Sequence, residues 1–407
     1  MTRNSILIIV RTESDFERAI AIGIAGKNDY NLKFVFVGDF SPFFYDGIQN
    51  EFQKALFRNQ GFKIQDFSEY DIVGNILRLL CKTQAINFNQ VRKNRKLFLN
   101  YLFYKIYCRY IQHQKTHIVN QIITKIRPKF ILTDQSITVK DYIPELIRMA
   151  AVRKNIPVFI FTHGAAGGLH SAFSNPDFDP YTGYTVFACN KYETNPTFSN
   201  RIILGDISSS FPYVHYINNL SLHDLDFLNE RKFKIAFMVG GTGPYTSTTG
   251  WYIQEEIIIE LSENSDVAMV LKLHPREAQF IDLRMLEKFN NLLIVNKETD
   301  RSRVTKWADI IVCSDHCSTI FEPMILGKKV VAIEGKHIPR FKNSHSPIKD
   351  STSIHINNSS GFKLENLYSS NPNDDIVNKV AWGENGPIDL AKLLFRFVES
   401  EQSKLSK

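Results

Sequence analysis

Short apolar runs alternate with amphipathic stretches along the first part of the chain. Residues 6–10 are apolar enough for a buried strand, residues 15–25 carry apolar side chains at helical spacing, and residues 33–37 form a second apolar run. Such alternation of strands and helices is typical of βαβ units and a parallel sheet. The pattern continues with a predicted helix at 46–59 and a predicted strand at 62–67.

A helical period then replaces the alternation. Apolar residues recur every three or four positions, which predicts two long helices that run to Arg127. Pro128 stops them, because proline cannot continue a helix. Beyond this point we expect a helix at 143–154 and strands at 130–133, 157–161, 185–188 and 201–204.

The pattern loosens after Ser208 and shows no clear strand or helix period until Arg231. A second α/β run follows, with helices expected at 250–262 and 302–308. Its predicted strands lie at 234–239, 267–273, 292–295, 309–313 and 329–333. The stretch 342–374 is rich in Ser and Asn and is expected to be loop.

With 407 residues the chain is too long for one ordinary core, so two α/β domains are expected. We predict an N-terminal domain over 1–215, a linker over 216–233, a C-terminal domain over 234–385 and a final helix within 386–407. A composition of 43% hydrophobic and 22% charged residues suits a globular enzyme, and no run approaches the ~18 apolar residues of a spanning helix.

The five cysteines show no disulfide-framework spacing, which favours reduced thiols and a cytoplasmic location. Cys313 and Cys317 flank Asp315 and His316, but their spacing matches no zinc pattern. We therefore expect no metal and no other cofactor. Asp177 and Asp179 form an Asp-x-Asp pair for which the sequence supplies no evident third ligand.

The net charge of +7 is unevenly distributed, because residues 72–133 contain no Asp or Glu. The same stretch carries twelve basic residues with aromatic residues interleaved among them. Such a segment favours an anionic partner, which could be a nucleic acid, an acidic lipid surface or a phosphorylated substrate. A solvated basic helix face is the alternative interpretation.

Three segments that directly follow predicted strands of the second domain are suited to binding phosphate. In open parallel sheets, ligands bind outside the carboxyl ends of the strands. Gly240 to Gly243, which includes Gly241 and Thr242, would let the backbone approach a phosphate before the next helix begins. A tight turn without a ligand would use the same residues.

The second segment is Lys272-Leu273-His274-Pro275-Arg276. Its proline fixes the turn that holds the imidazole, and its two cations offer positive charge to a phosphate.

The third segment runs from Ser314 to Glu322. Thr319 and Glu322 have the spacing of a capping box, which would place Ser318 and Thr319 at a helix N-terminus suited to phosphate. Glu322 could instead accept hydrogen bonds from ribose hydroxyls. A plain helix cap is the alternative.

His163 follows a predicted strand of the first domain and precedes a glycine-rich loop. An imidazole titrates near working pH, so His163 is our candidate general base. A loop histidine with no catalytic role is the alternative.

The segments at Lys272–Pro275 and Ser314–Glu322 resemble the C-terminal domain of GT-B glycosyltransferases. The most similar variants are bacterial capsule, lipopolysaccharide and teichoic-acid enzymes, which include Kdo and sialyl transferases and CDP-glycerol glycerophosphotransferases. The resemblance implies two Rossmann-like domains that face each other across a cleft, with the C-terminal helix returning to the first domain. It implies donor contacts for His274, Pro275, Ser318 and Thr319, and the His163 loop is similar to a segment whose histidine acts as base.

The resemblance thus implies a glycosyltransferase that uses a nucleotide-activated sugar, with a CMP-sugar of the Kdo or sialic type favoured. The Glu-Asp-Gly or Asp-Asp-Gly signature common in sialyl and Kdo transferases is absent. Expected partners are the donor, a glycan or lipid-linked glycan acceptor and an anionic membrane surface, with no nucleic acid. The enzyme would be cytoplasmic and peripheral on the inner membrane. A CDP-polyol phosphotransferase, a nucleotide-sugar 2-epimerase and a non-catalytic nucleotide-binding or RNA-binding module are alternatives.

Overall fold

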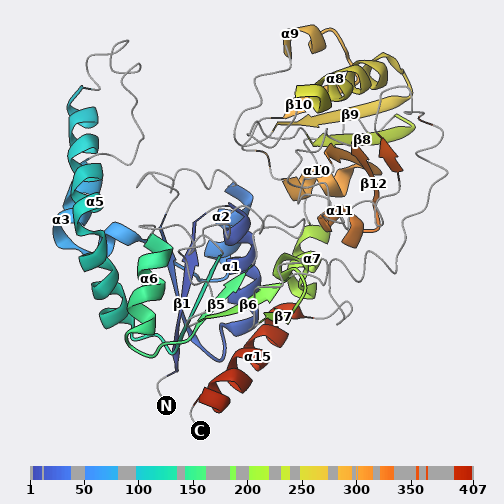
Figure 1. Cartoon of the computed structure of the whole chain (residues 1–407). Coiled ribbons are helices and arrows are strands. Elements are labelled where there is room, and N and C mark those ends of the chain that lie inside the picture. The colour runs from blue at the N-terminus through green and yellow to red at the C-terminus, as the bar shows by residue number, and fades with distance from the viewer. Residues whose placement is uncertain are drawn as a thin grey trace.

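The chain forms two α/β lobes, each built on its own parallel sheet (Figure 1). The computed structural model describes residues 3–11, 13–37, 51–80, 98–134, 143–161, 184–188, 201–219, 231–238, 248–273, 283–295, 299, 301–314, 321–333, 354–356, 364 and 389–405. No helix within these ranges is long and apolar enough to span a membrane.

The N-terminal lobe holds a seven-stranded sheet in the order β3-β2-β1-β4-β5-β6-β7, with every neighbouring pair parallel. This order changes direction between β1 and β4, the kind of position at which doubly wound sheets bind ligands. The strands are β1 (Ser5–Val10), β2 (Asn31–Phe36), β3 (Ile64–Asp66), β4 (Phe130–Asp134), β5 (Val158–Phe161), β6 (Tyr184–Ala188) and β7 (Arg201–Ile203).

Helices cover both faces of this sheet because alternate residues of its buried strands point to opposite sides. Ile6 and Ile8 of β1 belong to one core cluster, whereas Leu7 and Ile9 belong to the other. The first face is covered by α1 (Glu13–Gly26), α2 (Glu51–Asn59), α7 (Phe211–Asn218) and α15 (Leu390–Leu405). The second is covered by η2 (Phe67–Tyr70), α3 (Ile72–Leu80), α5 (Phe98–Ile126) and α6 (Ile143–Val152).

The C-terminal lobe holds a six-stranded parallel sheet in the order β10-β9-β8-β11-β12-β13, which repeats the same topology. Its strands are β8 (Phe233–Met238), β9 (Val267–Lys272), β10 (Leu292–Val295), β11 (Ile310–Ser314), β12 (Lys329–Ile333) and β13 (Ile354–Ile356). Its helices are α8 (Thr248–Glu263), α9 (Leu283–Leu286), α10 (Arg301–Trp307) and α11 (Phe321–Ile325).

The last helix, α15, returns to the N-terminal lobe as predicted (Figure 1). Phe395 stacks on Tyr30 with ring centroids 4.7 Å apart, and Tyr30 donates a hydrogen bond to Glu399. Gly26 of α1 permits this close approach, because a Cβ there would lie 2.5 Å from the ring of Phe395. The predicted two-domain α/β architecture is therefore confirmed.

Of the two long helices expected before Pro128, α5 has 29 residues, and the rest of the expected stretch, 81–97, lies outside the described residues. Two local predictions differ from the structure. The stretch after Ser208 contains α7, whose Tyr213 and Ile217 are buried in the first core. A short strand, β13, lies inside the expected loop 342–374, where it extends the sheet beside β12.

Candidate functional site

The three predicted phosphate segments follow β8, β9 and β11, which are neighbours in the C-terminal sheet and end at the same edge. The register pairs Lys272 with Met238, and Met238 with Cys313, so the ends of β9, β8 and β11 form one row. The order β10-β9-β8-β11 places the reversal of strand order between β8 and β11, within this row. This is the edge and the position at which such sheets bind ligands.

The first segment lies wholly outside the described residues, and the second and third lie only partly within them. Lys272 ends β9, Ser314 ends β11, and Glu322 is the second residue of α11. The other candidates lie outside the described residues, and their roles stay predictions. They are His163, Gly241, Thr242, Gly243, His274, Pro275, Arg276, Ser318 and Thr319; Asp177 and Asp179 lie outside as well.

Lys272 is a buried cation at the carboxyl edge of the sheet. Lys272 is 7% exposed, and its Nζ donates a hydrogen bond to the carbonyl oxygen of Leu273, 3.1 Å away. A buried ammonium group needs compensating acceptors. Lys272 is therefore a cation at the sheet edge where the donor phosphate is predicted to bind.

Glu322 makes contacts that the capping-box interpretation does not include. Its Oε2 accepts hydrogen bonds from Arg301 Nη2 and Ser302 Oγ, each 3.0 Å away. Its Oε1 is buried and has no hydrogen-bond partner in the part of the chain that the structure describes. Because α11 has only five residues, its dipole adds little at this point.

Arg301 joins this carboxylate to the other lobe. Its Nη2 lies 3.1 Å from both Oε1 and Oε2 of Glu17, on α1 of the N-terminal lobe. Glu17 is 7% exposed and also accepts a hydrogen bond of 2.8 Å from Gln53 Nε2 on α2. One guanidinium thus pairs with two carboxylates that come from different lobes.

Electrostatics keep Arg301 charged in this position. Burial alone would lower the pKa of Arg301, but the carboxylates of Glu17 and Glu322 outweigh burial and hold that pKa well above its usual value. Its Nε is buried and, within the described part of the chain, has no hydrogen-bond partner. Among the described residues, Arg301 Nε is thus a donor and Glu322 Oε1 an acceptor without a hydrogen bond.

A polar hydroxyl ligand has the groups that this cluster lacks, because a hydroxyl can both donate and accept a hydrogen bond. Arg301 Nε and Glu322 Oε1 are buried in this arrangement, so a ligand would reach them only after the lobes or the side chains shift. Arg301 and Glu17 were not among the residues proposed from the sequence. A strand-end signal existed for Arg301, which begins the helix after β10, but none indicated its contact with α1.

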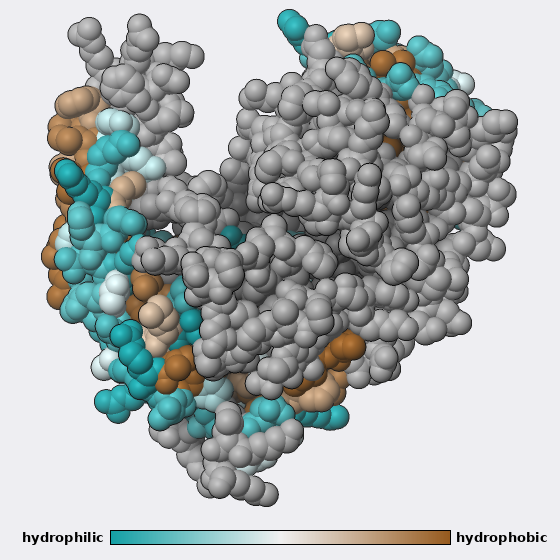
Figure 2. All heavy atoms as spheres, viewed as in Figure 1, coloured by the Kyte–Doolittle hydropathy of each residue, from teal (hydrophilic) through white to brown (hydrophobic). Residues whose placement is uncertain are grey.

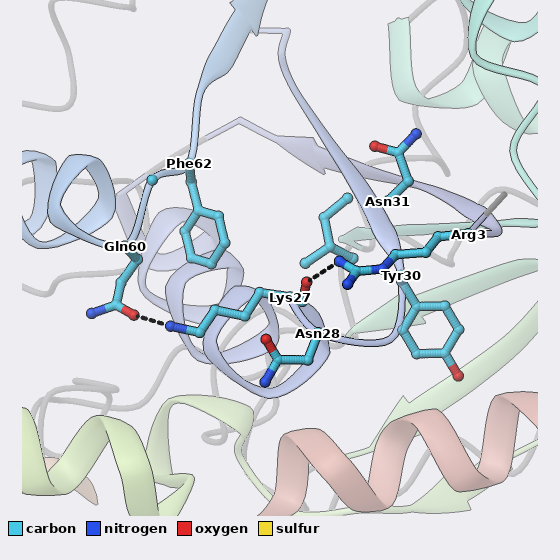
Figure 3. Close-up of a pocket in the computed structure, with 9 residues that line it drawn as sticks. Arg3, Lys27, Asn28, Tyr30, Asn31, Gln60 and Phe62 are labelled. Carbon is cyan, nitrogen blue, oxygen red and sulfur yellow. Dashed lines mark hydrogen bonds between the residues drawn. The ribbon is translucent and has the colours of Figure 1, made fainter. Parts of the chain in front are cut away.

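A surface groove of about 590 Å³ lies in the N-terminal lobe, at the edge of its sheet where the strands begin (Figure 3). In it, Arg3 Nη1 donates to the carbonyl oxygen of Lys27 at 3.1 Å, and Lys27 Nζ donates to Gln60 Oε1 at 2.9 Å. Arg3 precedes β1 and Asn31 begins β2, so the groove lies at the amino ends of the strands. The donor site, in contrast, is predicted at the carboxyl ends of the strands of the C-terminal lobe, so this groove is not that site.

Solved structures share this architecture over nearly their whole length. The chain is similar to a UDP-N-acetylglucosamine 2-epimerase described as putative from Listeria monocytogenes, with a TM-score of 0.58, 11% identity and coverage of 99% of this chain and 98% of that one. It is also similar to the UDP-GlcNAc 2-epimerase from Neisseria meningitidis, bound to UDP-GlcNAc, with a TM-score of 0.55, 12% identity and coverage of 97% and 100%.

A glycosyltransferase from Rickettsia africae is similar to a comparable degree, with a TM-score of 0.54, 12% identity and coverage of 98% and 99%. No protein-family profile and no curated protein sequence matches the chain. At these identities the likeness shows the fold, which is the GT-B-like arrangement of two α/β lobes.

Proposed function

We propose that the chain is a glycosyltransferase that moves a sugar from a nucleotide-activated donor to a glycan or lipid-linked glycan acceptor. The observation that carries this proposal is the row formed by the ends of β9, β8 and β11. Because of this row, three segments with residues suited to phosphate start side by side, at the point where the strand order reverses. The donor would therefore bind to the C-terminal lobe.

In this proposal each residue has one task. Lys272 and Arg276 neutralise the donor phosphates, together with the backbone of Gly241 to Gly243 and the hydroxyls of Ser318 and Thr319. His274, held by Pro275, contacts the nucleotide, and Ser314 lies at the start of the third segment. Glu322 accepts hydrogen bonds from the ribose hydroxyls. These protein groups supply the charge compensation without a metal.

His163 would act from the other lobe. It would take the proton of the acceptor hydroxyl as that oxygen attacks the donor sugar, while the nucleotide leaves with its phosphate charge stabilised by the C-terminal lobe. We place the enzyme in the cytoplasm. The resemblance to Kdo and sialyl transferases favours a CMP-sugar, whereas similar solved structures hold UDP and UDP-GlcNAc.

A 2-epimerase is the second candidate, and the comparisons favour it. Several of the similar structures are described as UDP-GlcNAc 2-epimerases and match the chain over 97% or more of its length. An epimerase needs a nucleotide-sugar site but no acceptor. A CDP-polyol phosphotransferase would use the same donor residues, so it belongs in the same test.

The test is turnover of CMP-, UDP-, GDP- and CDP-linked donors with and without glycan acceptors, followed by nucleotide release and by NMR of the sugar. Nucleotide release that requires an acceptor supports transfer. Conversion of UDP-GlcNAc to its 2-epimer without an acceptor would establish the epimerase instead. Turnover of none of the donors would contradict both.

The role of His163 has its own matched control. His163→Ala should lower kcat by about 10²–10⁴-fold, whereas His117→Ala, an exposed histidine on α5, should leave kcat unchanged. Equal turnover by the two variants would remove His163 from the mechanism.

A further inference from the structure

Exposed apolar side chains gather on one part of the N-terminal lobe. Of the twelve large apolar side chains that are exposed in the described residues, nine lie on α3 and the first turns of α5, so their clustering is not random scatter. Figure 2 shows this as a hydrophobic band along the edge formed by these helices. The nine residues, here called the α3–α5 face, are Ile72, Val73, Ile76, Leu79, Leu80, Phe98, Leu99, Leu102 and Ile106.

The spacing of these residues defines one stripe on each helix. On α3 they recur at positions i, i+4 and i+7 from Ile72, and on α5 at i, i+4 and i+8 from Phe98. Residues at these intervals lie on the same side of a helix. Exposures of 79% for Ile72 and 61% for Leu79 on α3, and of 62% for Leu99 beside the α5 stripe, show that the described residues leave the stripes uncovered.

The two stripes are held together by defined contacts between the helices. Asp71 Oδ1 accepts hydrogen bonds from the backbone N–H of Gly74 and from the hydroxyl of Tyr110, both 2.7 Å away. Gly74 lets α3 pack closely, because a Cβ there would lie 3.2 Å from the carbonyl oxygen of Ser68 and 3.4 Å from Ile111 Cδ1. These contacts fix the start of α3 against α5 at Tyr110 and Ile111.

Positive charge accompanies the apolar stripes. Lys105 and Arg109 are exposed on α5 and, at intervals of three or seven residues from Leu102 and Ile106, share their side of the helix. Residues 72–133 contain no acidic residue at all.

The nearest carboxylates on the packed elements already have cationic or buried partners. Glu69 lies 3.2 Å from Arg78, and Glu145 lies 2.7 Å from Arg148, while Asp71 is buried between α3 and Tyr110. The surface is therefore apolar and cationic without local compensation.

We infer that the α3–α5 face docks onto an anionic lipid bilayer. Apolar side chains would enter the boundary between headgroups and acyl chains, and Lys105 and Arg109 would contact anionic headgroups. A second copy of the chain fits less well, because a symmetric contact would bring two acid-free basic segments together. RNA fits less well too, because it offers no apolar layer for Ile and Leu side chains.

This inference goes beyond the proposed catalytic activity and is tested without it. The purified full chain is sedimented with vesicles of phosphatidylcholine alone and with vesicles of an equal mixture of phosphatidylcholine and phosphatidylglycerol. Binding only to the mixed vesicles, with loss of binding at high salt, is the expected result. Catalytic inactivity of the same preparation would contradict the proposed function and leave this result standing.

Two variants separate the apolar and the charged contributions. Leu99→Gln with Leu102→Gln, and Lys105→Gln with Arg109→Gln, should each lower vesicle affinity by about tenfold or more. The matched controls in the C-terminal lobe, Met285→Gln and Lys288→Gln, change an exposed apolar and an exposed basic residue and should bind as the wild type does. Thermal unfolding establishes that each variant is folded.

Two outcomes would overturn the inference. One is vesicle binding that both α5 variants retain. The other is a dimer in analytical ultracentrifugation that Leu99→Gln with Leu102→Gln dissociates, together with no binding of the wild type to anionic vesicles. The second outcome would assign the face to a second copy of the chain.

Discussion

Arg301 Nη2 lies 3.1 Å from both carboxylate oxygens of Glu17, although the two residues are 284 positions apart and belong to different lobes. The same nitrogen lies 3.0 Å from Glu322, the candidate ribose ligand. A single guanidinium thus links the contact between the lobes to the predicted donor site. A hydroxyl ligand that donates to Glu322 would compete with Arg301 for this carboxylate.

Removing the guanidinium should destabilise the protein. Arg301→Gln leaves the carboxylates of Glu17 and Glu322 without their cation, and the loss of one partner from a largely buried pair costs about 3 kcal/mol. The measurement is urea unfolding at neutral pH. Arg303→Gln, on the same helix but only partly buried, is the control and should change the free energy of unfolding by less than about 1 kcal/mol. Equal effects of the two changes would mean that the interlobe pair contributes nothing specific.

Loss of the Glu322 carboxylate should weaken nucleotide binding through the ribose. Glu322→Ala should reduce affinity for a ribonucleotide by about tenfold to a hundredfold, because a hydrogen bond to a charged group contributes about 1.5–3 kcal/mol. The matching 2′,3′-dideoxynucleotide lacks these hydroxyls, so the wild type and Glu322→Ala should bind it with the same low affinity. Isothermal titration calorimetry measures both, with Glu260→Ala, an exposed residue of α8, as control. An equal loss of affinity for both nucleotides would exclude ribose as the partner of Glu322.

Tyr110 should stabilise the α3–α5 packing in a pH-dependent way. Burial, the hydrogen bond to Asp71 and the charge of Asp71 raise the pKa of Tyr110 from 10.0 to about 12. Because the folded-state pKa lies above the unfolded one, the stabilisation is complete below pH 10.0 and is lost as pH rises toward 12. Tyr110→Phe should therefore cost about 1 kcal/mol at neutral pH, and the difference from the wild type should shrink above pH 10.0.

The measurement is urea unfolding of wild type and Tyr110→Phe from neutral pH upward. Tyr101→Phe on the same helix is the control, since its ring lies under Lys105. A difference that stays constant to the highest pH at which the protein folds would contradict the Asp71 contact.

The strands of both sheets were predictable because buried parallel strands are continuous apolar runs. Val267 to Lys272, for example, is buried at every position and was predicted within one residue. The helix α7 was missed because it has eight residues with proline at its start, so too few apolar positions recur to define a period. Its Tyr213 and Ile217 become recognisable as core residues only in the folded lobe.

The places of three candidate residues were predictable for the same reason, although their roles stay predictions. Lys272 and Ser314 end β9 and β11, and Glu322 lies in the helix after β11, which is a local property of the sequence. Arg301 begins a helix in the same way, but its importance comes from Glu17, and a contact across 284 positions leaves no local pattern. Residues that join two lobes are therefore the part of such a site that sequence reasoning misses.

The return of α15 to the N-terminal lobe predicts a large effect for one aromatic residue. Phe395 is 6% exposed, stacks on Tyr30 at 4.7 Å and fills the space that Gly26 leaves on α1. Phe395→Ala should cost about 3–4 kcal/mol of the free energy of unfolding, because the ring has no other group to replace it. Arg396→Ala, an exposed neighbour on the same helix, should cost less than about 0.5 kcal/mol and serves as the control.

Because α15 contacts the N-terminal core, native-state hydrogen exchange of Phe395→Ala should show the loss of protection in β1 and β2 and leave β8 and β9 protected. Loss of protection in β8 and β9 alone would mean that α15 stabilises the other lobe.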